Sequence, residues 1–209
     1  MKTITDIKEQ AKNKKRVNVY LDGVYYCGLD LVTAVKYRLK KGMQIKESDI
    51  VEMQRTSEMQ ACFDSALNYL SLSIKTTKQV RDNLLKKGYL SEVVDETVLK
   101  LNEYGYLNDL EYAKRYVESY KNSKGKRLIE LELIKKGVKK ECVYDALNLI
   151  EEQTESIEKL AEKYLKNKNK DLKTLQKLFK YLISKGFGYD EVQLAISSIK
   201  TDGKTEFCE

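Results

Sequence analysis

Few side chains of this chain could do chemistry of their own. The 209 residues include no histidine and four widely separated cysteines, which are Cys27, Cys62, Cys142 and Cys208. Without histidine, the usual Cys/His zinc sites and every histidine-dependent base or triad are excluded. Since no C-x-x-C pair occurs, we expect reduced, buried thiols of a cytosolic protein and no metal site.

Two further patterns resemble catalytic motifs but fail on spacing. Gly203-Lys204-Thr205 resembles the end of a phosphate-binding loop, yet that loop needs a glycine where Ser198 stands. Glu130 and Glu132 are two positions apart and cannot share one face of a helix, so they are not paired carboxylates. The residues therefore predict a binding protein rather than an enzyme, with no cofactor.

Surface charge is the remaining source of recognition. The chain has a net charge of +7, and basic residues exceed acidic ones by four both in residues 1–60 and in residues 159–209. Residues 61–109 carry a net charge of −1, and residues 110–158 are neutral. Basic ends permit contact with a polyanion such as nucleic acid, although a solvated helical surface of mixed charge explains the same numbers.

The elements that must position these residues repeat along the chain. The phrases LLKKGY, LIKKGV and LISKGF place Gly88, Gly137 and Gly186 at intervals of 49 residues. Six aliphatic columns share this interval, which predicts an internal repeat of helical units. The columns are Val80/Ile129/Leu178, Leu84/Leu133/Leu182, Leu85/Ile134/Ile183, Val94/Val143/Val192, Val98/Leu147/Ile196 and Leu101/Ile150/Ile199.

Each repeat is expected to hold three helices. The glycine follows the second helix, where we expect a left-handed helix cap rather than a ligand site. Thr76 and Gln79 have the spacing of a capping box at the start of such a helix. An A-x-x-Y motif marks the first helix, and its tyrosines are expected to pack rather than stack on bases. They are Tyr69, Tyr116 and Tyr164.

The first 60 residues differ in character. The stretch VNVYLDGVYYC alternates apolar and polar residues around Asp22-Gly23, which predicts a β-hairpin with a type I′ turn. The hairpin is expected to pack on a helix over Asp30–Lys41, ended by Gly42, or on a partner. The segment Lys46–Ser73 is expected to hold one long helix or two.

The predicted fold is mainly α, with three tandem three-helix repeats in an elongated curved array behind a small β-hairpin and helix module. Predicted bounds are 1–60 for the module, 61–109, 110–158 and 159–201 for the repeats, and 202–209 for a tail. The start lacks an apolar leader core, and no apolar run approaches the ~20 residues of a membrane span. We expect a soluble, cytoplasmic monomer with no membrane contact.

Four phrases resemble the RecX family of recombination regulators. They are AxxYLS at Ala66–Ser71, TxxQVRxxLLKKGY at Thr76–Tyr89, GYLNDxxYAxxYV at Gly105–Val117 and GKRxIxxELxxKGV at Gly125–Val138. The resemblance covers roughly residues 60–200. It implies a non-enzymatic protein that binds the RecA filament on single-stranded DNA and inhibits or destabilises it. RecA ATPase, strand exchange and co-protease activity would then fall.

Exposed basic residues between the apolar columns are the candidate contacts with RecA or DNA. For each of them, an ordinary solvated side chain is the alternative. We expect reversing the charges of Lys124, Lys126 and Arg127 to weaken RecA inhibition and leave helicity intact. The full set is Arg81, Lys86, Lys114, Arg115, Lys121, Lys124, Lys126, Arg127 and Lys135.

Two other functions stay open from the residues alone. A general helical DNA- or RNA-binding protein would need a recognition helix with clustered Arg, Asn or Gln, which no repeat helix clearly has. A protein-only scaffold, a common use of helical repeats, would show no affinity for nucleic acid and no effect on RecA.

Overall fold

The computed structural model describes residues 1–11 and 13–205, the side chains of residues 200–205 excepted. Contacts divide the chain into two compact units. The first unit comprises Met1–Ile74 with Val80–Leu107, and the second comprises Lys75–Gln79 with the chain from Asn108 onward. The described part is mainly α-helical, with ten helices and four strands, which confirms the predicted fold class.

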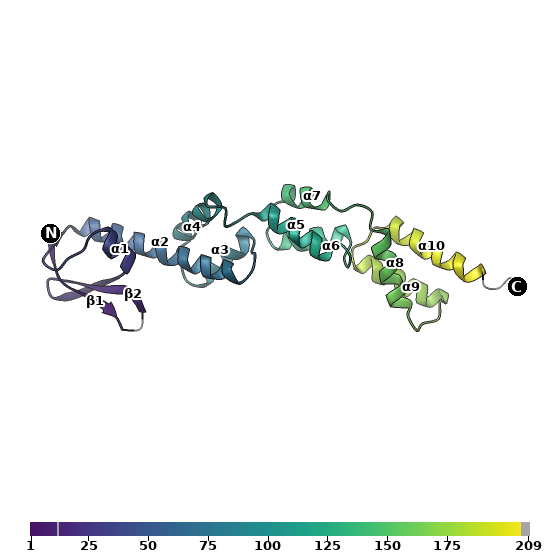
Figure 1. The fold of residues 1–209 in the computed structure, drawn as a ribbon, viewed down its shortest axis with the longest axis horizontal. Coiled ribbons are helices and arrows are strands. Elements are labelled where there is room, and N and C mark those ends of the chain that lie inside the picture. Colours follow the sequence, from purple (N-terminus) through teal and green to yellow (C-terminus); the bar gives the residue numbers. More distant parts are fainter. Residues whose placement is uncertain (12, 206–209) are drawn as a thin grey trace. The chain divides into compact units, whose positions relative to one another are not determined.

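An antiparallel four-stranded sheet opens the first unit, beside α1 (Figure 1). Its strand order is β3-β2-β1-β4. The β2–β3 hairpin turns at Asp22-Gly23, whose φ angles of 49° and 88° are both positive, as a type I′ turn requires. The hairpin is thus confirmed, whereas the sequence analysis missed β1. The strands are β1 (Lys2–Gln10), β2 (Asn13–Leu21), β3 (Val24–Asp30) and β4 (Gln44–Ile45).

The alternating residues of the hairpin supply the core of this module. Val17, Val19 and Leu21 are each 3% exposed, and they pack with Ile4 of β1 and Leu29 of β3. Successive side chains of a strand point to opposite faces, so this spacing turns one face of the sheet inward. The inward face packs against α1 and the start of α2, which stabilises a hairpin that would be marginal alone.

Helix α1 (Leu31–Lys36) is shorter than predicted, and the expectation of a helix over Asp30–Lys41 is wrong. The chain leaves the helix at Arg38, whose φ is 51°. It then returns to the sheet, where the Gly42 N–H donates to the Ile4 carbonyl (2.8 Å) and β4 pairs with β1. Gly42 therefore does not end the helix; with a φ of 87° it belongs to the turn that leads into β4.

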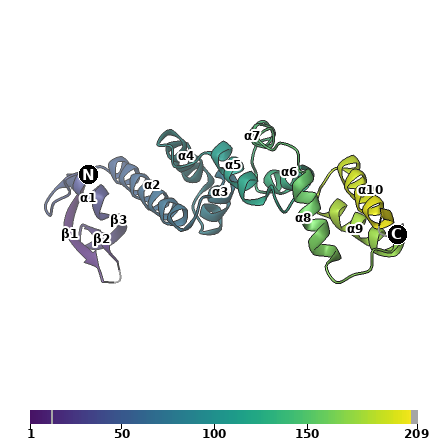
Figure 2. The same cartoon turned by 45° about the vertical axis from the view of Figure 1, so that its right-hand side comes forward.

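Helix α2 (Glu47–Leu72) is continuous, which settles the choice between one long helix and two (Figure 2). Its first turns pack on the sheet, and its last turns form a three-helix group with α3 (Thr77–Lys86) and α4 (Ser91–Glu103). The first turn of α3, Thr77–Gln79, makes its contacts in the second unit.

The second unit contains two further three-helix groups, each with its own core. The helices of the middle group are α5 (Asp109–Tyr120), α6 (Lys126–Lys135) and α7 (Lys140–Leu147). Figure 2 shows the last group, α8 (Thr154–Leu165), α9 (Leu172–Ser184) and α10 (Tyr189–Thr205). Helix α10 continues into the range predicted as a tail, and Cys208 lies outside the described residues.

The repeated columns fill the three group cores. The columns of residues 80, 129, 178 and of residues 84, 133, 182 are completely buried. The column that contains Ile134 lies at the margin, since that side chain is 37% exposed. The small column Thr97/Ala146/Ala195 is also buried, so helices can approach closely there.

Local capping signals are confirmed. The φ angles of Gly88, Gly137 and Gly186 lie between 87° and 89°, so each glycine is a left-handed cap after its helix. Thr76 and Gln79 form the reciprocal capping box. The Gln79 N–H donates to the Thr76 hydroxyl (3.2 Å), and the Thr76 N–H donates to the Gln79 side chain (3.1 Å).

Candidate protein and nucleic-acid interface

The start of α3 is bonded to the middle three-helix group at what we call the first junction, formed by residues 76–78, 109, 136 and 137. The Thr76 hydroxyl donates to the carbonyl of Lys136 at the end of α6 (2.7 Å). The Thr77 N–H donates to the carboxylate of Asp109 at the start of α5 (2.8 Å). Helix starts leave main-chain N–H groups unpaired and helix ends leave carbonyls unpaired, so these bonds satisfy both termini.

A second junction, formed by residues 125–128, 153, 185 and 186, repeats this arrangement. Its donor Gly125 and acceptor Lys185 lie 49 positions after Thr76 and Lys136. The Gly125 N–H donates to the carbonyl of Lys185 at the end of α9 (2.8 Å). The Lys126 N–H donates to the side-chain oxygen of Gln153, which precedes α8 (3.1 Å). Gln153 is 3% exposed, and its amide also donates to the carbonyls of Lys121 and Lys124.

Two repeated glycines lie inside these junctions. An ideal Cβ on Gly137 would lie 2.4 Å from the Cβ of Lys78, and one on Gly186 would lie 2.4 Å from the Cβ of Leu128. Such distances are shorter than any real contact, so both positions need glycine for close approach as well as for positive φ. Sequence reasoning predicted that these glycines cap helices, but it did not predict the close contacts. The contacting residues lie about 60 positions away along the chain.

The predicted loop from Lys121 to Arg127 does not present all its charges to solvent. The Lys124 ammonium bonds both oxygens of Glu132 (2.6 and 2.8 Å) and lies 4.0 Å from the centre of the Tyr120 ring. Lys121 forms an ion pair with Glu118 (2.9 Å). Lys124 therefore supports the fold of the middle group, although its type and position also suited a contact residue.

Glu132 and Tyr116 complete this cluster. The Tyr116 hydroxyl donates to Glu132 (2.7 Å). Burial, followed by the bond to Glu132, raises the pKa of Tyr116 far above its ordinary value. Burial alone would raise the pKa of Glu132, but hydrogen bonds from Lys124 and Tyr116 outweigh it and hold that pKa below its ordinary value.

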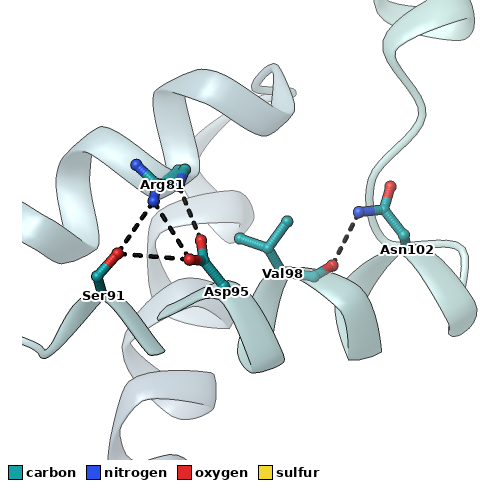
Figure 3. Close-up of polar contacts among 5 residues, drawn as sticks. All are labelled: Arg81, Ser91, Asp95, Val98 and Asn102. Atoms are coloured by element: carbon teal, nitrogen blue, oxygen red, sulfur yellow. Dashed lines mark hydrogen bonds and ion pairs between the residues drawn. The ribbon is translucent and has the colours of Figure 1, made fainter. Parts of the chain in front are cut away.

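Two of the predicted arginines are bonded within the protein. Arg81 of α3 forms an ion pair with Asp95 of α4 (2.9 Å) and donates to Ser91 (3.1 Å), as Figure 3 shows. The hydrogen bond from Arg81 lowers the pKa of Asp95. Arg115 pairs with Glu111 one turn earlier on α5 (2.9 Å). These pairs are half-exposed, so they limit the freedom of the arginines while leaving them accessible.

Five predicted basic residues are exposed and have no ion pair among the described residues. One stands at the end of α3 in the first unit, and the other four belong to α5 and α6 in the second unit. The five are Lys86, Lys114, Lys126, Arg127 and Lys135. They are the predicted contacts that a macromolecular partner can reach without breaking an internal bond.

The repeated tyrosines pack against the cores of their own groups, as expected. Lysine ammonium groups lie near several of the rings. Lys136 lies 5.4 Å from the Tyr116 ring centre, and Lys168 lies 3.5 Å from the Tyr164 ring centre. Lys136 and Lys168 thus make cation–π contacts with repeated tyrosines, which the sequence analysis missed. These tyrosines are poor candidates for base stacking because core side chains and lysines occupy their surroundings.

No metal centre is found in the part of the chain that the structure describes. No group of three or more His, Cys, Asp or Glu side chains could hold a metal there. Cys27 and Cys62 are buried free thiols whose pKa values burial raises, and Cys142 is half-buried. No helix in this part has the length and apolar character of a membrane span.

Four family models match most of the chain. The model of the regulatory protein RecX N-terminal domain matches residues 2–46. Models of the first, second and third three-helix domains of RecX match residues 62–101, 108–147 and 151–196. Each of the last three matches falls on one of the three-helix groups.

Curated relatives and a solved structure agree with these models. The chain is 37% identical over 202 residues to a regulatory protein RecX of Bacillus licheniformis, covering 94% of this chain and 77% of that protein. It is 38% identical over 208 residues to that of Bacillus subtilis, covering 96% and 78%. A crystal structure of a regulatory protein RecX superposes with a TM-score of 0.74 at 28% identity, covering 93% of this chain and 98% of that one. On this agreement of sequence, repeat and fold, the chain belongs to the RecX family.

Proposed function

We propose that this protein is a non-enzymatic regulator that binds the RecA filament on single-stranded DNA and inhibits or destabilises it. Its relatives are named regulatory proteins, and family membership is the observation that carries the proposal. Binding would lower RecA ATPase, strand exchange and co-protease activity, acting in the cytoplasm on recombination and DNA repair.

A helical array suits a polymeric target. The three three-helix groups have separate cores, and stacked helical repeats commonly form extended binding surfaces. A filament offers many identical protomers, so several weak contacts by one chain can add through effective concentration. Such a regulator needs no catalytic group of its own.

The exposed lysines and arginine of α5 and α6 are the proposed contacts with RecA or its DNA. Lys126 and Arg127 open α6, and neither side chain forms an ion pair with another residue that the structure describes. Phosphates or carboxylates of the filament would pair with them, and such contacts weaken as salt rises. Lys124 is removed from this proposed set because Glu132 holds it.

The first test is the single-stranded-DNA-dependent ATPase of the cognate RecA, titrated with this protein below and up to one copy per RecA protomer. We expect suppression well below stoichiometry. No effect at saturating protein, with RecA itself active, would refute the proposal and favour a protein-only scaffold. Salt-sensitive, sequence-dependent binding to bare DNA without RecA inhibition would instead indicate a general DNA-binding protein.

A further inference from the structure

Two of the three repeated glycines are covered by another helix, and the third is open. Around Gly137 and Gly186, residues of a preceding helix start occupy the place of a Cβ. A Cβ on Gly88 would meet nothing within 4 Å, although its φ of 89° is the same. No preceding three-helix group exists to cover Gly88, since the chain before it forms the sheet module.

The main-chain carbonyl next to Gly88 also differs from its two counterparts in its hydrogen bonding. The carbonyls of Lys136 and Lys185 accept the junction hydrogen bonds. Among the described residues, nothing donates to the equivalent carbonyl of Lys87. The first unit therefore ends α3 with an open glycine and an unused acceptor, the two features that receive a helix start in each junction.

The residue that follows each repeated glycine is buried in the two junctions and only half-buried after Gly88. Val138 is 4% exposed and Phe187 is 1% exposed. Their counterpart Tyr89 is only half-buried, and its hydroxyl donates to the Ala61 carbonyl (3.1 Å). Tyr89 lines a groove of about 640 Å³ in the first unit.

The groove also contains a carboxylate that could accept a hydrogen bond from the start of a docked helix, as Asp109 does in the first junction. In the first junction, Asp109 accepts the N–H of the first helical residue. Asp64 and Ser65 of α2 line the groove beside Tyr89, and Asp64 is exposed. A helix start that reached Gly88 would therefore find an acceptor for its free N–H groups.

We propose that Gly88, the Lys87 carbonyl and the adjoining groove form a docking site for the N-terminal turn of a helix from a partner protein. The two internal junctions define what fits. The partner helix begins with Thr, Ser or Gly, which donates to the Lys87 carbonyl as Thr76 and Gly125 do to theirs. Lys15 and Arg16 also line the groove, so carboxylates in the first turn of the partner helix would be favoured there.

A second copy of this chain does not supply the matching helix. The starts of α3 and α6 are already held in the two junctions. In the third repeat, the position equivalent to Thr77 and Lys126 is Leu175 of α9. Helix α9 begins three residues earlier, at Leu172, and Asp171 caps its first turn. That first turn would occupy the place where a junction needs its hydrogen-bond donor, so α9 does not fit the site. The site is accordingly assigned to a different protein, and it stands apart from the proposed action on RecA.

The variant Gly88→Asn tests the site without removing the cap, because asparagine tolerates the left-handed conformation and adds a Cβ where the helix would approach. Gly105→Asn is the matched control. Gly105 also caps a helix of the first unit with positive φ (73°), and it also has nothing within 4 Å, but it lies outside the repeated column.

The probe is a synthetic peptide of residues 122–135 from the second junction, stapled between positions 130 and 134 to hold the helix. It is titrated to millimolar concentration into the full-length, ¹⁵N-labelled protein. We expect saturable shifts of the Ser65, Gly88 and Tyr89 amides, weakened about tenfold in Gly88→Asn and unchanged in Gly105→Asn. A peptide N-methylated at Gly125 lacks the junction donor and should bind more weakly. Absence of saturable shifts, or equal binding by Gly88→Asn and wild type, would overturn the proposal.

Discussion

The hydroxyl of Thr76 donates to the main-chain carbonyl of Lys136 across 2.7 Å, although 60 positions separate the two residues. The same oxygen accepts the N–H of Gln79. One buried side chain therefore caps the start of α3 and also satisfies the end of α6. The second junction makes the corresponding bond from a main-chain N–H, that of Gly125.

Replacing Thr76 with valine should destabilise the second compact unit. The Thr76→Val side chain keeps its shape but leaves the Lys136 carbonyl without a donor and the Gln79 N–H without an acceptor. We expect the free energy of unfolding to fall by about 1–3 kcal/mol, measured by amide hydrogen exchange in α5 and α6. Thr76→Ser keeps the hydroxyl and should retain most of the stability. Equal exchange rates in the two variants would contradict a role for this bond.

Replacing Gly125 with alanine should be destabilising, against the usual direction. Gly125 has a φ of −76°, so alanine meets no backbone strain and would normally stabilise by about 0.4–1 kcal/mol. Its Cβ would, however, lie 2.1 Å from the Gly186 carbonyl oxygen. We expect a loss of about 1–3 kcal/mol from forced separation of the two helix ends, measured by urea unfolding. A stabilised Gly125→Ala protein would show that the junction yields easily.

The cluster of Lys124, Glu132 and Tyr116 should make stability fall at both ends of the pH range. The pKa of Glu132 is lowered in the folded state, so its contribution is present above the ordinary value of 4.5 and is lost as pH falls below it. The pKa of Tyr116 is raised, so the unfolded chain loses its phenolic proton first and stability falls as pH rises above 10.0.

Glu132→Gln tests the acid side of this dependence. The variant should flatten the loss of stability between neutral pH and pH values below 4.5, measured by urea unfolding at several pH values. Glu155→Gln is the control, because Glu155 pairs with Lys159 on an exposed helix surface and solvent screens that pair. Indistinguishable pH profiles for Glu132→Gln and wild type would remove the cluster as a source of acid sensitivity.

Local signals explain what the sequence predicted well. Asp22-Gly23 specifies its own turn, because few residue pairs adopt positive φ twice in succession. The 49-residue interval predicted the three cores, since helical periodicity records which face is buried. Strand β1 lacked such a signal, because most of its side chains are half-exposed and its alternation is weak. The length of α1 was overestimated because its end depends on pairing with a strand far away in sequence.

The candidate interface was less predictable for the same reason. Residue type and helical position cannot tell an exposed lysine from one that a distant carboxylate holds. Lys124 and Lys126 looked equivalent in sequence, yet Lys124 is bonded to Glu132 while the Lys126 side chain is exposed. The junction contacts of Gly137 and Gly186 could not be predicted either. A repeated glycine indicates a positive φ angle, but it does not indicate which distant residue packs against it.

Reversing the charges at the start of α6 tests the proposed contact surface. Lys126→Glu/Arg127→Glu leaves the Lys124–Glu132 pair intact, and acidic residues suit the first turn of a helix, so the fold should be kept. If these side chains meet the RecA filament, the concentration needed for half-inhibition of RecA ATPase should rise about tenfold, and wild-type inhibition should weaken with added salt. Lys139→Glu/Lys140→Glu makes the same change on exposed residues at the start of α7 and should inhibit normally. Equal inhibition by both double variants would place the contact with RecA elsewhere, because the two changes alter net charge identically and differ only in position.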